Sequence, residues 1–355
     1  MTLRSIDAGV VAAPMAGGAS TPELVAAVGE AGGFGFLAAG YLTTEQLAAQ
    51  VAGAWDLTSR PFGVNLFVPD AANVYAVRPG GLTGAERVTA VAAYRESLAE
   101  DAAALGVEPG EPRPGDTDDW ERKLDLVVRE RVTAVSFTFG MPSAAVLGEL
   151  ARAGIESVVT VTDVDEARAA LEAGVDGLCV QGVEAGGHRG TLDPTSVPDD
   201  SDLGTLVERV RQSARDLGRA GVVIIAAGGI TTRDRADAVR AAGADAVQVG
   251  TALLLTPEAG TGLAYRRALT DAAYGSTRVT RAFSGRLGRC LETDFVRRHD
   301  EHAPAAYPEL HHVTVPLRRT SAQLDKPDVV ALWAGTGWRA SRAEPAATVV
   351  AGLAR

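Results

Sequence analysis

The chain has 355 residues, 46% of them hydrophobic and 22% charged, which is close to the average for globular proteins and excludes disordered and fibrous classes. Its 34 basic and 45 acidic residues give a net charge of −11, and without a basic stretch we expect no nucleic-acid partner. The two cysteines, Cys179 and Cys290, are too few for a disulfide framework, and no segment is apolar for long enough to span a membrane, so we expect a cytoplasmic protein with no membrane partner.

Short apolar runs alternate with helical segments along the first 250 residues. The runs are continuous rather than alternating, which is typical of parallel strands buried on both faces. Cap residues such as Thr21, followed by Pro22, mark the helices between them. We predict eight strands, at residues 10–14, 34–38, 62–68, 132–139, 156–161, 177–181, 221–227 and 245–250.

The alternation is interrupted between residues 69 and 119. This stretch is too long for an ordinary connection between a strand and a helix. Its middle, 85–105, has a helical pattern, and its end is rich in proline, glycine and acidic residues. We interpret it as an inserted lid, with Asp118 or Asp119 starting the helix that returns to the core.

Eight strands alternating with helices predict an α/β fold, a (β/α)8 TIM barrel, better than they predict an open sheet. We assign residues 1–255 to the barrel, including the insert at about 69–119. The helix-rich remainder, 256–355, is too long to be one closing helix. We expect it to form a smaller helical subdomain together with the insert, packing over the active site and closing the barrel.

Two glycine-containing loops follow the seventh and eighth strands, where TIM barrels often bind phosphate. Gly228-Gly229 follows the seventh strand, and Gln248-Val249-Gly250-Thr251 ends the eighth. Bare backbone N–H groups next to a helix N-terminus favour an anion. One such pair would be read as a tight turn, but two at adjacent barrel positions predict a phosphorylated ligand.

The stretch from Gly177 to Thr191 carries the densest set of polar residues after any strand. Gln181, a Gly-Gly pair and His188 lie within it. A solvated loop with a surface histidine is the simpler interpretation. However, the same rim of the barrel should hold Pro14, Met15 and Asn65, whose amide and backbone groups suit the edge of a flavin ring. His188 is then the acid or base beside that ring. No cluster of carboxylates or histidines suggests a metal.

Six segments together carry a family resemblance: AAPMAGGAS at 12–20, GVNLF at 63–67, VSFTFG at 135–140, QGVEAGGHRG at 181–190, AAGGI at 226–230 and QVGTALL at 248–254. In order along most of the chain, they resemble the FMN-dependent nitronate monooxygenases, formerly called 2-nitropropane dioxygenases. The resemblance implies a TIM barrel carrying FMN, with His188 as the catalytic histidine. It implies FMN contacts from Asn65, Gln181, Gly186, Gly229, Gln248, Val249, Gly250 and Thr251, besides Pro14 and Met15 on the rim.

The implied reaction oxidises an alkyl nitronate with O2 to a carbonyl compound and nitrite, without NAD(P)H. His188 would deprotonate a neutral nitroalkane or, when protonated, hold the nitronate oxygens. The partners would be a small nitronate or nitroalkane and O2, and the protein would be a monomer or homodimer.

Some residues depart from the family pattern and bear on the substrate. Thr336 stands where many members have glutamine. Ser284 could reach the substrate or be a turn residue. Trp333 and Trp338 are predicted to pack the C-terminal tail on the barrel.

Two other functions stay open. An NAD(P)H-dependent FMN oxidoreductase, such as an enoyl-ACP reductase or a quinone reductase, could share the barrel and the EAGGH loop. A carrier protein would need a basic docking face, and the compact basic pairs, 297–298 and 318–319, are predicted to be solvated surface. A non-catalytic flavin-binding protein is the second alternative.

Overall fold

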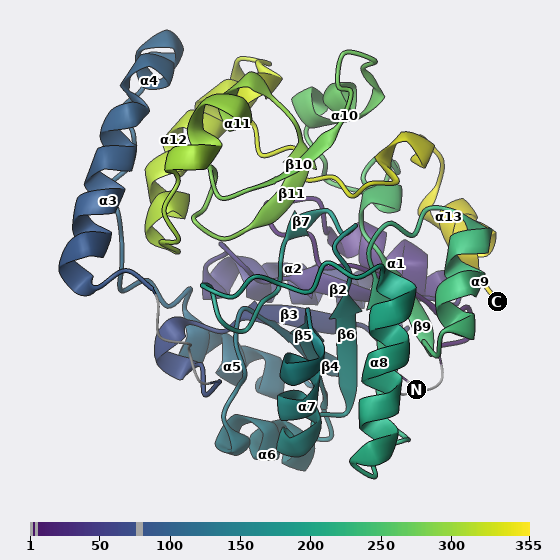
Figure 1. Ribbon diagram of the computed structural model, residues 1–355. Coiled ribbons are helices and arrows are strands. Elements are labelled where there is room, and N and C mark those ends of the chain that lie inside the picture. Colours follow the sequence, from purple (N-terminus) through teal and green to yellow (C-terminus); the bar gives the residue numbers. More distant parts are fainter. Residues whose placement is uncertain (1–2, 4–5, 76–80) are drawn as a thin grey trace.

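The computed structural model describes residue 3, residues 6–75 and residues 81–355 (Figure 1). Eight parallel strands form a closed barrel in which β1 pairs with β9. The predicted TIM barrel is confirmed, and every predicted strand is present within two residues of its expected ends. The barrel strands are β1 (Val10–Ala12), β2 (Phe34–Ala38), β3 (Gly63–Phe67), β4 (Ala134–Thr138), β5 (Glu156–Val161), β6 (Gly177–Gln181), β8 (Val223–Ala227) and β9 (Ala246–Val249).

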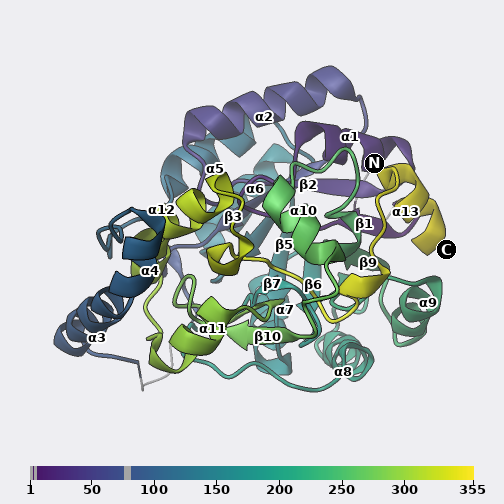
Figure 2. The same ribbon diagram turned by 90° about the horizontal axis from the view of Figure 1, so that it is seen from above.

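A ring of helices covers the outside of the barrel (Figure 2). Several begin at side-chain caps: Thr21, Thr43, Ser143, Asp163 and Thr232 each accept a hydrogen bond from a backbone N–H of the first turn. The last helix of the chain, α13, packs between α1 and α9. It therefore takes the place of the eighth helix in the ring. The ring consists of α1 (Pro22–Glu30), α2 (Thr44–Leu57), α5 (Trp120–Arg129), α6 (Ala144–Ala153), α7 (Val164–Ala173), α8 (Leu203–Asp216), α9 (Arg233–Ala241) and α13 (Ala346–Leu353).

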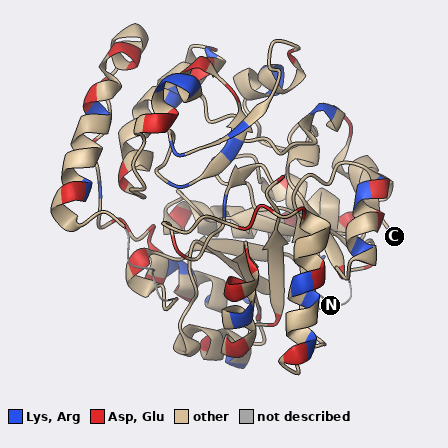
Figure 3. Ribbon diagram, in the orientation of Figure 1, with Lys and Arg blue, Asp and Glu red and all other residues tan. Residues whose placement is uncertain are grey.

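The barrel strands are buried on both faces. Phe36 and Val158 belong to one apolar cluster, whereas their neighbours Leu37 and Val159 belong to another. Because successive strand side chains point to opposite faces, the first cluster fills the barrel and the second lies under the helices. Burial on both faces explains why the strands read as continuous apolar runs. Charged residues are spread over the outer helices and loops (Figure 3).

The insert and the C-terminal region share a second hydrophobic core above the barrel (Figure 1). Tyr94 and Leu98 of the insert pack in the same cluster as Phe295 and Leu310, and the Tyr94 hydroxyl donates to Ala282 O at 2.5 Å. Residues 76–80 of the expected insert lie outside the described residues. The helices concerned are α3 (Gly84–Ser97), α4 (Ala99–Leu105), α10 (Leu263–Thr270), α11 (Asp294–His299) and α12 (Glu309–Gln323), with short 3-10 helices at 70–72, 251–253, 300–302, 327–329 and 338–340.

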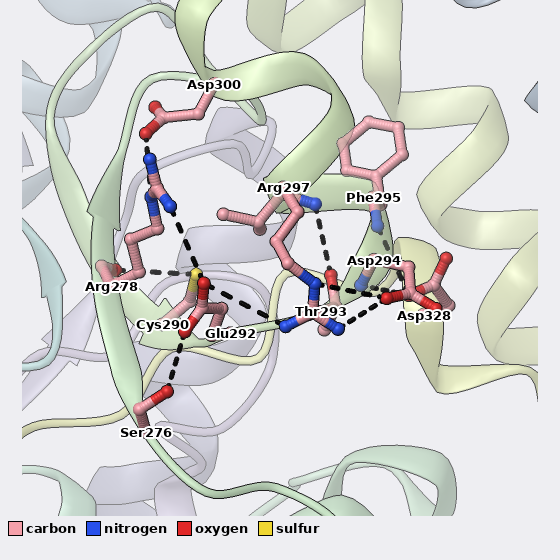
Figure 4. A network of polar contacts seen from close by, with 11 residues as sticks. Ser276, Arg278, Cys290, Glu292, Thr293, Asp294, Phe295, Arg297, Asp300 and Asp328 are labelled. Atoms are coloured by element: carbon pink, nitrogen blue, oxygen red, sulfur yellow. Dashed lines mark hydrogen bonds and ion pairs between the residues drawn. The ribbon is translucent and has the colours of Figure 1, made fainter.

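The subdomain is not purely helical, which corrects the prediction. It contains a three-stranded antiparallel sheet in the order β10 (Thr277–Thr280), β11 (Gly288–Leu291) and β7 (Gly187–His188). Figure 4 shows polar side chains along β10 and β11, where Arg278 pairs with Asp300 at 3.0 Å and Ser276 donates to Glu292 at 2.7 Å. Strands of four residues or fewer are too short to show an alternating pattern, so the sequence does not reveal them.

The end of the insert is fixed by two carboxylates. Asp118 accepts a hydrogen bond from Tyr41 N at 2.9 Å and pairs at 2.8 Å with Lys123, whose ammonium also donates to Ala39 O. Asp119 precedes α5, as expected, but its carboxylate makes no cap. It accepts from Thr44 N at 3.2 Å instead. These contacts attach the start of α5 to the loop after β2.

Lys123→Ala is expected to lower the free energy of unfolding by about 3 kcal/mol at pH 8, because it leaves the buried Asp118 carboxylate without its counter-ion. Burial raises the pKa of Asp118 to about 6, so the cost should shrink at pH 5, where the carboxyl is protonated. Urea unfolding at both pH values measures this difference.

The adjacent Arg122→Ala variant is the control. Arg122 pairs with Glu45 at the exposed surface, and such a pair contributes no more than about 1 kcal/mol. Equal costs for the two variants would contradict the assignment of Lys123 as a buried anchor.

Candidate active site

A cavity of about 190 Å³ lies at the carboxyl ends of the barrel strands. Its wall includes every residue predicted to contact the cofactor, together with His188: Pro14, Met15, Asn65, Gln181, Gly186, Gly229, Gln248, Val249, Gly250 and Thr251. Ser284 is not part of the wall but lies behind His188. No described residue of the insert lines the cavity. The C-terminal region contributes Tyr265, Trp333, Gly335 and Gly337.

Two turns at one end of the cavity expose backbone. Gly228 and Gly229 have φ values of +132° and +64°, and α9 begins shortly after them. Residues other than glycine rarely adopt such values. Gly250 packs against Met15 and is followed by Thr251, which starts a 3-10 helix. The arrangement fits a phosphate held by backbone groups.

Amide side chains lie deeper in the cavity. Asn65 donates to Ser136 Oγ at 2.9 Å and to Thr138 Oγ1 at 3.0 Å, so its amide has the partners that burial requires. Gln248 donates to Cys179 Sγ at 3.3 Å. Burial raises the pKa of Cys179 to about 12. The thiol therefore stays protonated at neutral pH and packs in the barrel.

Hydrogen bonds join the start of the loop that carries His188 to residues near its end. Gln181 donates to His188 O at 2.8 Å and accepts from Gly190 N at 2.9 Å. The buried guanidinium of Arg189 donates to the carbonyl oxygens of Gln181 and Gly182. Gln181 thus anchors the loop, a role that the sequence did not indicate, in addition to its place on the cavity wall.

The far end of the same loop is fixed by a buried carboxyl. Glu166 on α7 accepts from Leu192 N at 2.7 Å and from Thr162 N at 2.6 Å. Asn73 donates to Leu192 O at 2.8 Å. Both ends of the loop are therefore tied to the barrel, and His188 has a defined position between them.

His188 stands in an aromatic and cationic surrounding. Its Nε2 lies 2.7 Å from Ser284 Oγ, and its ring lies 4.7 Å from Trp333 and 5.5 Å from Phe139. Burial, with the positive charges of Arg286 and Arg318, lowers the pKa of His188 to about 3. The imidazole is therefore neutral at physiological pH. Of the two roles predicted for His188, this favours the base over the cation that holds an anion.

Comparison with known proteins identifies the relatives of this chain. The family model for nitronate monooxygenase matches residues 3–355. The chain belongs to the nitronate monooxygenase family. A "Probable nitronate monooxygenase" of Staphylococcus aureus is 31% identical over 98% of this chain and 94% of its own length, and one of Staphylococcus saprophyticus is 32% identical over 92% and 88%. Membership of this family makes the protein an oxidoreductase.

Solved structures agree with the barrel. Nitroalkane oxidase from Streptomyces ansochromogenes has a TM-score of 0.89 and 43% identity, covering 99% of this chain and 95% of that one. FabK from Thermotoga maritima has a TM-score of 0.72 at 23% identity, covering 99% and 93%. The second likeness concerns the fold alone.

The sequence did not predict that several aromatic residues line the cavity. Trp333 was expected to pack the tail, but it forms part of the cavity wall beside His188, whereas Trp338 packs in an apolar cluster as predicted. Phe139, Tyr41 and Tyr265 also line the cavity. Phe139 stands in the VSFTFG motif, which was a usable signal. Tyr41 and Tyr265 follow no motif that would have found them.

One of the expected surface pairs has a different environment. Arg318 on α12 donates to Thr314 Oγ1 at 3.1 Å and to His311 O at 3.2 Å. Burial lowers the pKa of this guanidinium. The prediction that the pair 318–319 is solvated surface is therefore wrong for Arg318.

The described part of the chain contains neither a cluster of metal ligands nor a helix that could span a membrane. No group of three or more His, Cys, Asp or Glu side chains there could hold a metal ion. Among these residues, no helix combines the length and apolarity needed to cross a bilayer.

Gly186→Ala is expected to destabilise the site. An added Cβ would lie 2.4 Å from Gly335 N and 2.6 Å from Ala334 C, and backbone atoms cannot move aside cheaply. We expect a loss of about 2 kcal/mol or more in the free energy of unfolding, measured by urea denaturation. Gly84→Ala, where an added Cβ meets no atom within 4 Å, should be nearly neutral. Equal behaviour would show that the 186 loop and the tail are not in close contact.

Proposed function

We propose that the chain is an FMN-dependent nitronate monooxygenase that oxidises alkyl nitronates with O2 to a carbonyl compound and nitrite, without NAD(P)H. The observation that carries the proposal is the neutral, half-buried His188 on the wall of a cavity that is also lined by the glycine turns at Gly228-Gly229 and Gly250. Family membership supports the reaction class. The protein would act in the cytoplasm, as a monomer or homodimer.

The cavity offers groups that suit FMN. The turns at Gly229 and at Gly250-Thr251 would hold the phosphate through backbone N–H groups. The ring would be held by the other predicted contacts on the cavity wall, which are Pro14, Met15, Asn65, Gln181, Gly186, Gln248 and Val249. When bound, FMN accepts electrons from the nitronate. The C-terminal region, 256–355, would cover the bound flavin, since Trp333 and Tyr265 form part of the wall.

The role of His188 follows from its charge state. A neutral imidazole can take the proton from the carbon next to a nitro group, provided that the substrate lies within hydrogen-bonding reach. The nitronate that forms is an anion, and the positive charges of Arg286 and Arg318 would stabilise it. Ser284, at 2.7 Å from Nε2, fixes the ring orientation during the transfer. Trp333 and Phe139 would exclude water from the reacting atoms.

Oxygen uptake with a nitronate tests the proposed reaction. The purified protein with its bound flavin should consume O2 rapidly with propyl-2-nitronate and release nitrite. With NADH or NADPH alone it should show no uptake and no loss of flavin absorbance. Rapid reduction by NAD(P)H with an inert nitronate would instead support the enoyl-ACP or quinone reductase alternative, and no turnover with any of them would support a flavin-binding protein.

His188→Gln should lower kcat/KM for a neutral nitroalkane by about 100-fold or more, because proton transfer by a positioned base contributes a factor of this order. Turnover of a preformed nitronate needs no deprotonation and should fall less. Oxygen-electrode kinetics on the two substrates separates these effects. His302→Gln changes an exposed histidine and is the control. Equal losses on both substrates would contradict the role of His188 as a base.

The pH dependence follows from the low pKa of His188. Because the group is already neutral well below pH 6, kcat/KM for a neutral nitroalkane should stay on its plateau down to about pH 5. Initial rates between pH 5 and 9 measure it, after correction for the small fraction of substrate that ionises on its own. An acidic limb with a midpoint of 6 to 7 would show that His188 titrates as an ordinary histidine.

A further inference from the structure

The end of the turn between β10 and β11 is bonded to the backbone at His188 and Arg189. Gly288 pairs with His188 across the sheet, and Arg189 N donates to Leu287 O at 2.7 Å. Ser284 and Arg286 belong to this turn. Ser284 Oγ contacts His188, and Arg286 N donates to the same oxygen at 3.3 Å. Arg286 and His188 are therefore coupled through Ser284 and through the backbone.

The Arg286 side chain is buried, with 2% of its surface exposed. It donates to Thr191 O at 3.0 Å and to Phe139 O at 3.1 Å, and its guanidinium carbon lies 4.2 Å from the centre of the Phe139 ring. The Phe139 ring also contacts the His188 ring, edge to face, with 5.5 Å between the ring centres. The guanidinium and the imidazole thus share one aromatic ring as neighbour, while Arg286 does not reach the cavity wall.

The positive charge of Arg286 has no counter-ion close by. None of the ion pairs formed among the described residues includes it, and the Nε of its guanidinium is buried without a partner. Carbonyl oxygens and aromatic faces are its neighbours. A buried guanidinium without a carboxylate is costly, which points to a use of the charge beyond packing.

The ionisable groups around His188 add to this field rather than cancel it. Those that act electrostatically on His188 are cationic, Arg286 and Arg318. His311 on α12, whose pKa burial lowers well below its usual value, stacks on Tyr41 at 3.8 Å between ring centres. Burial raises the pKa of Tyr41 to about 12 and that of Tyr307 well above its usual value, so both phenols stay neutral. The carboxylates that act electrostatically on Arg286 are those of Asp70 and Glu166, and neither forms an ion pair with it.

We propose that Arg286 is a positioning residue that holds Ser284 on His188 and, through its buried charge, keeps the imidazole unprotonated until substrate enters. The proposal rests on the proposed function for its use in catalysis, but not for the charge state that it assigns. A like charge nearby disfavours the imidazolium form. When His188 takes the proton of a nitroalkane, the nitronate anion forms at the same moment and offsets the positive charges. The positive charges thus oppose the transfer of a proton from solvent to His188. They do not oppose its transfer from the substrate, because that transfer also creates an anion beside them.

Nuclear magnetic resonance of the imidazole tests the assignment without measuring activity. The protein, labelled with ¹³C in its histidine rings, has five histidines, and the His188→Gln variant identifies the signal of His188. In the unchanged protein this signal should show no titration between pH 4.5 and 9. If each guanidinium shifts the titration midpoint by about one pH unit, Arg318→Gln alone should still show no titration in this range. Arg286→Gln with Arg318→Gln should bring the midpoint into it, and the difference between these two variants belongs to Arg286.

A neighbouring arginine that is exposed serves as the control. Arg319→Gln changes the exposed arginine next to Arg318 on α12, and it should leave the His188 signal unchanged. Arg286→Met, which keeps an apolar stem against Phe139, replaces Arg286→Gln if that variant does not fold. Superimposable His188 curves in the original and double-variant proteins would overturn the proposal, whether or not the protein oxidises nitronates.

Discussion

The pairing of β7 with β11 is the constraint on which the site depends. β7 is only Gly187 and His188, in the loop after the sixth barrel strand, and β11 comes a hundred residues later. Their two-residue ladder fixes the imidazole relative to Ser284, and Gln181, Arg189 and Glu166 fix the rest of the loop to the barrel. The barrel thus supplies one wall of the cavity, and the C-terminal region supplies Ser284, which orients the proposed base, His188.

The surroundings of His188 then decide its charge state. The rings of Trp333 and Phe139 lie beside it, and the positive charges of Arg286 and Arg318 oppose its protonation. An exposed histidine would be partly charged near neutral pH. Here the imidazole is neutral, and the positive field that keeps it neutral is also the field that an anionic product needs. In the proposed reaction, one arrangement of charges would therefore serve both the proton transfer and the stabilisation of the anion.

The sequence predicted the barrel well, for a physical reason. Strands buried on both faces appear as apolar runs, and capped helices separate them, so local patterns suffice. The predicted cofactor contacts also converge on one cavity because strand ends meet at one rim. The sequence failed where burial comes from partners far along the chain. Arg318 reads as a surface charge although it is bonded to Thr314 and His311. Trp333 reads as tail packing alone, although it also lines the cavity. The strands β10 and β11 are too short for a pattern to be detected.

A crystal structure of the protein with its bound flavin tests the central claim most directly. The account predicts the phosphate between the turns at Gly228-Gly229 and Gly250-Thr251, and the reactive face of the ring toward His188. It also predicts that the distance from His188 Nε2 to Ser284 Oγ stays near 2.7 Å. A flavin bound elsewhere, or a ring that turns its buried face to His188 and leaves no room for a small substrate between them, would contradict the account.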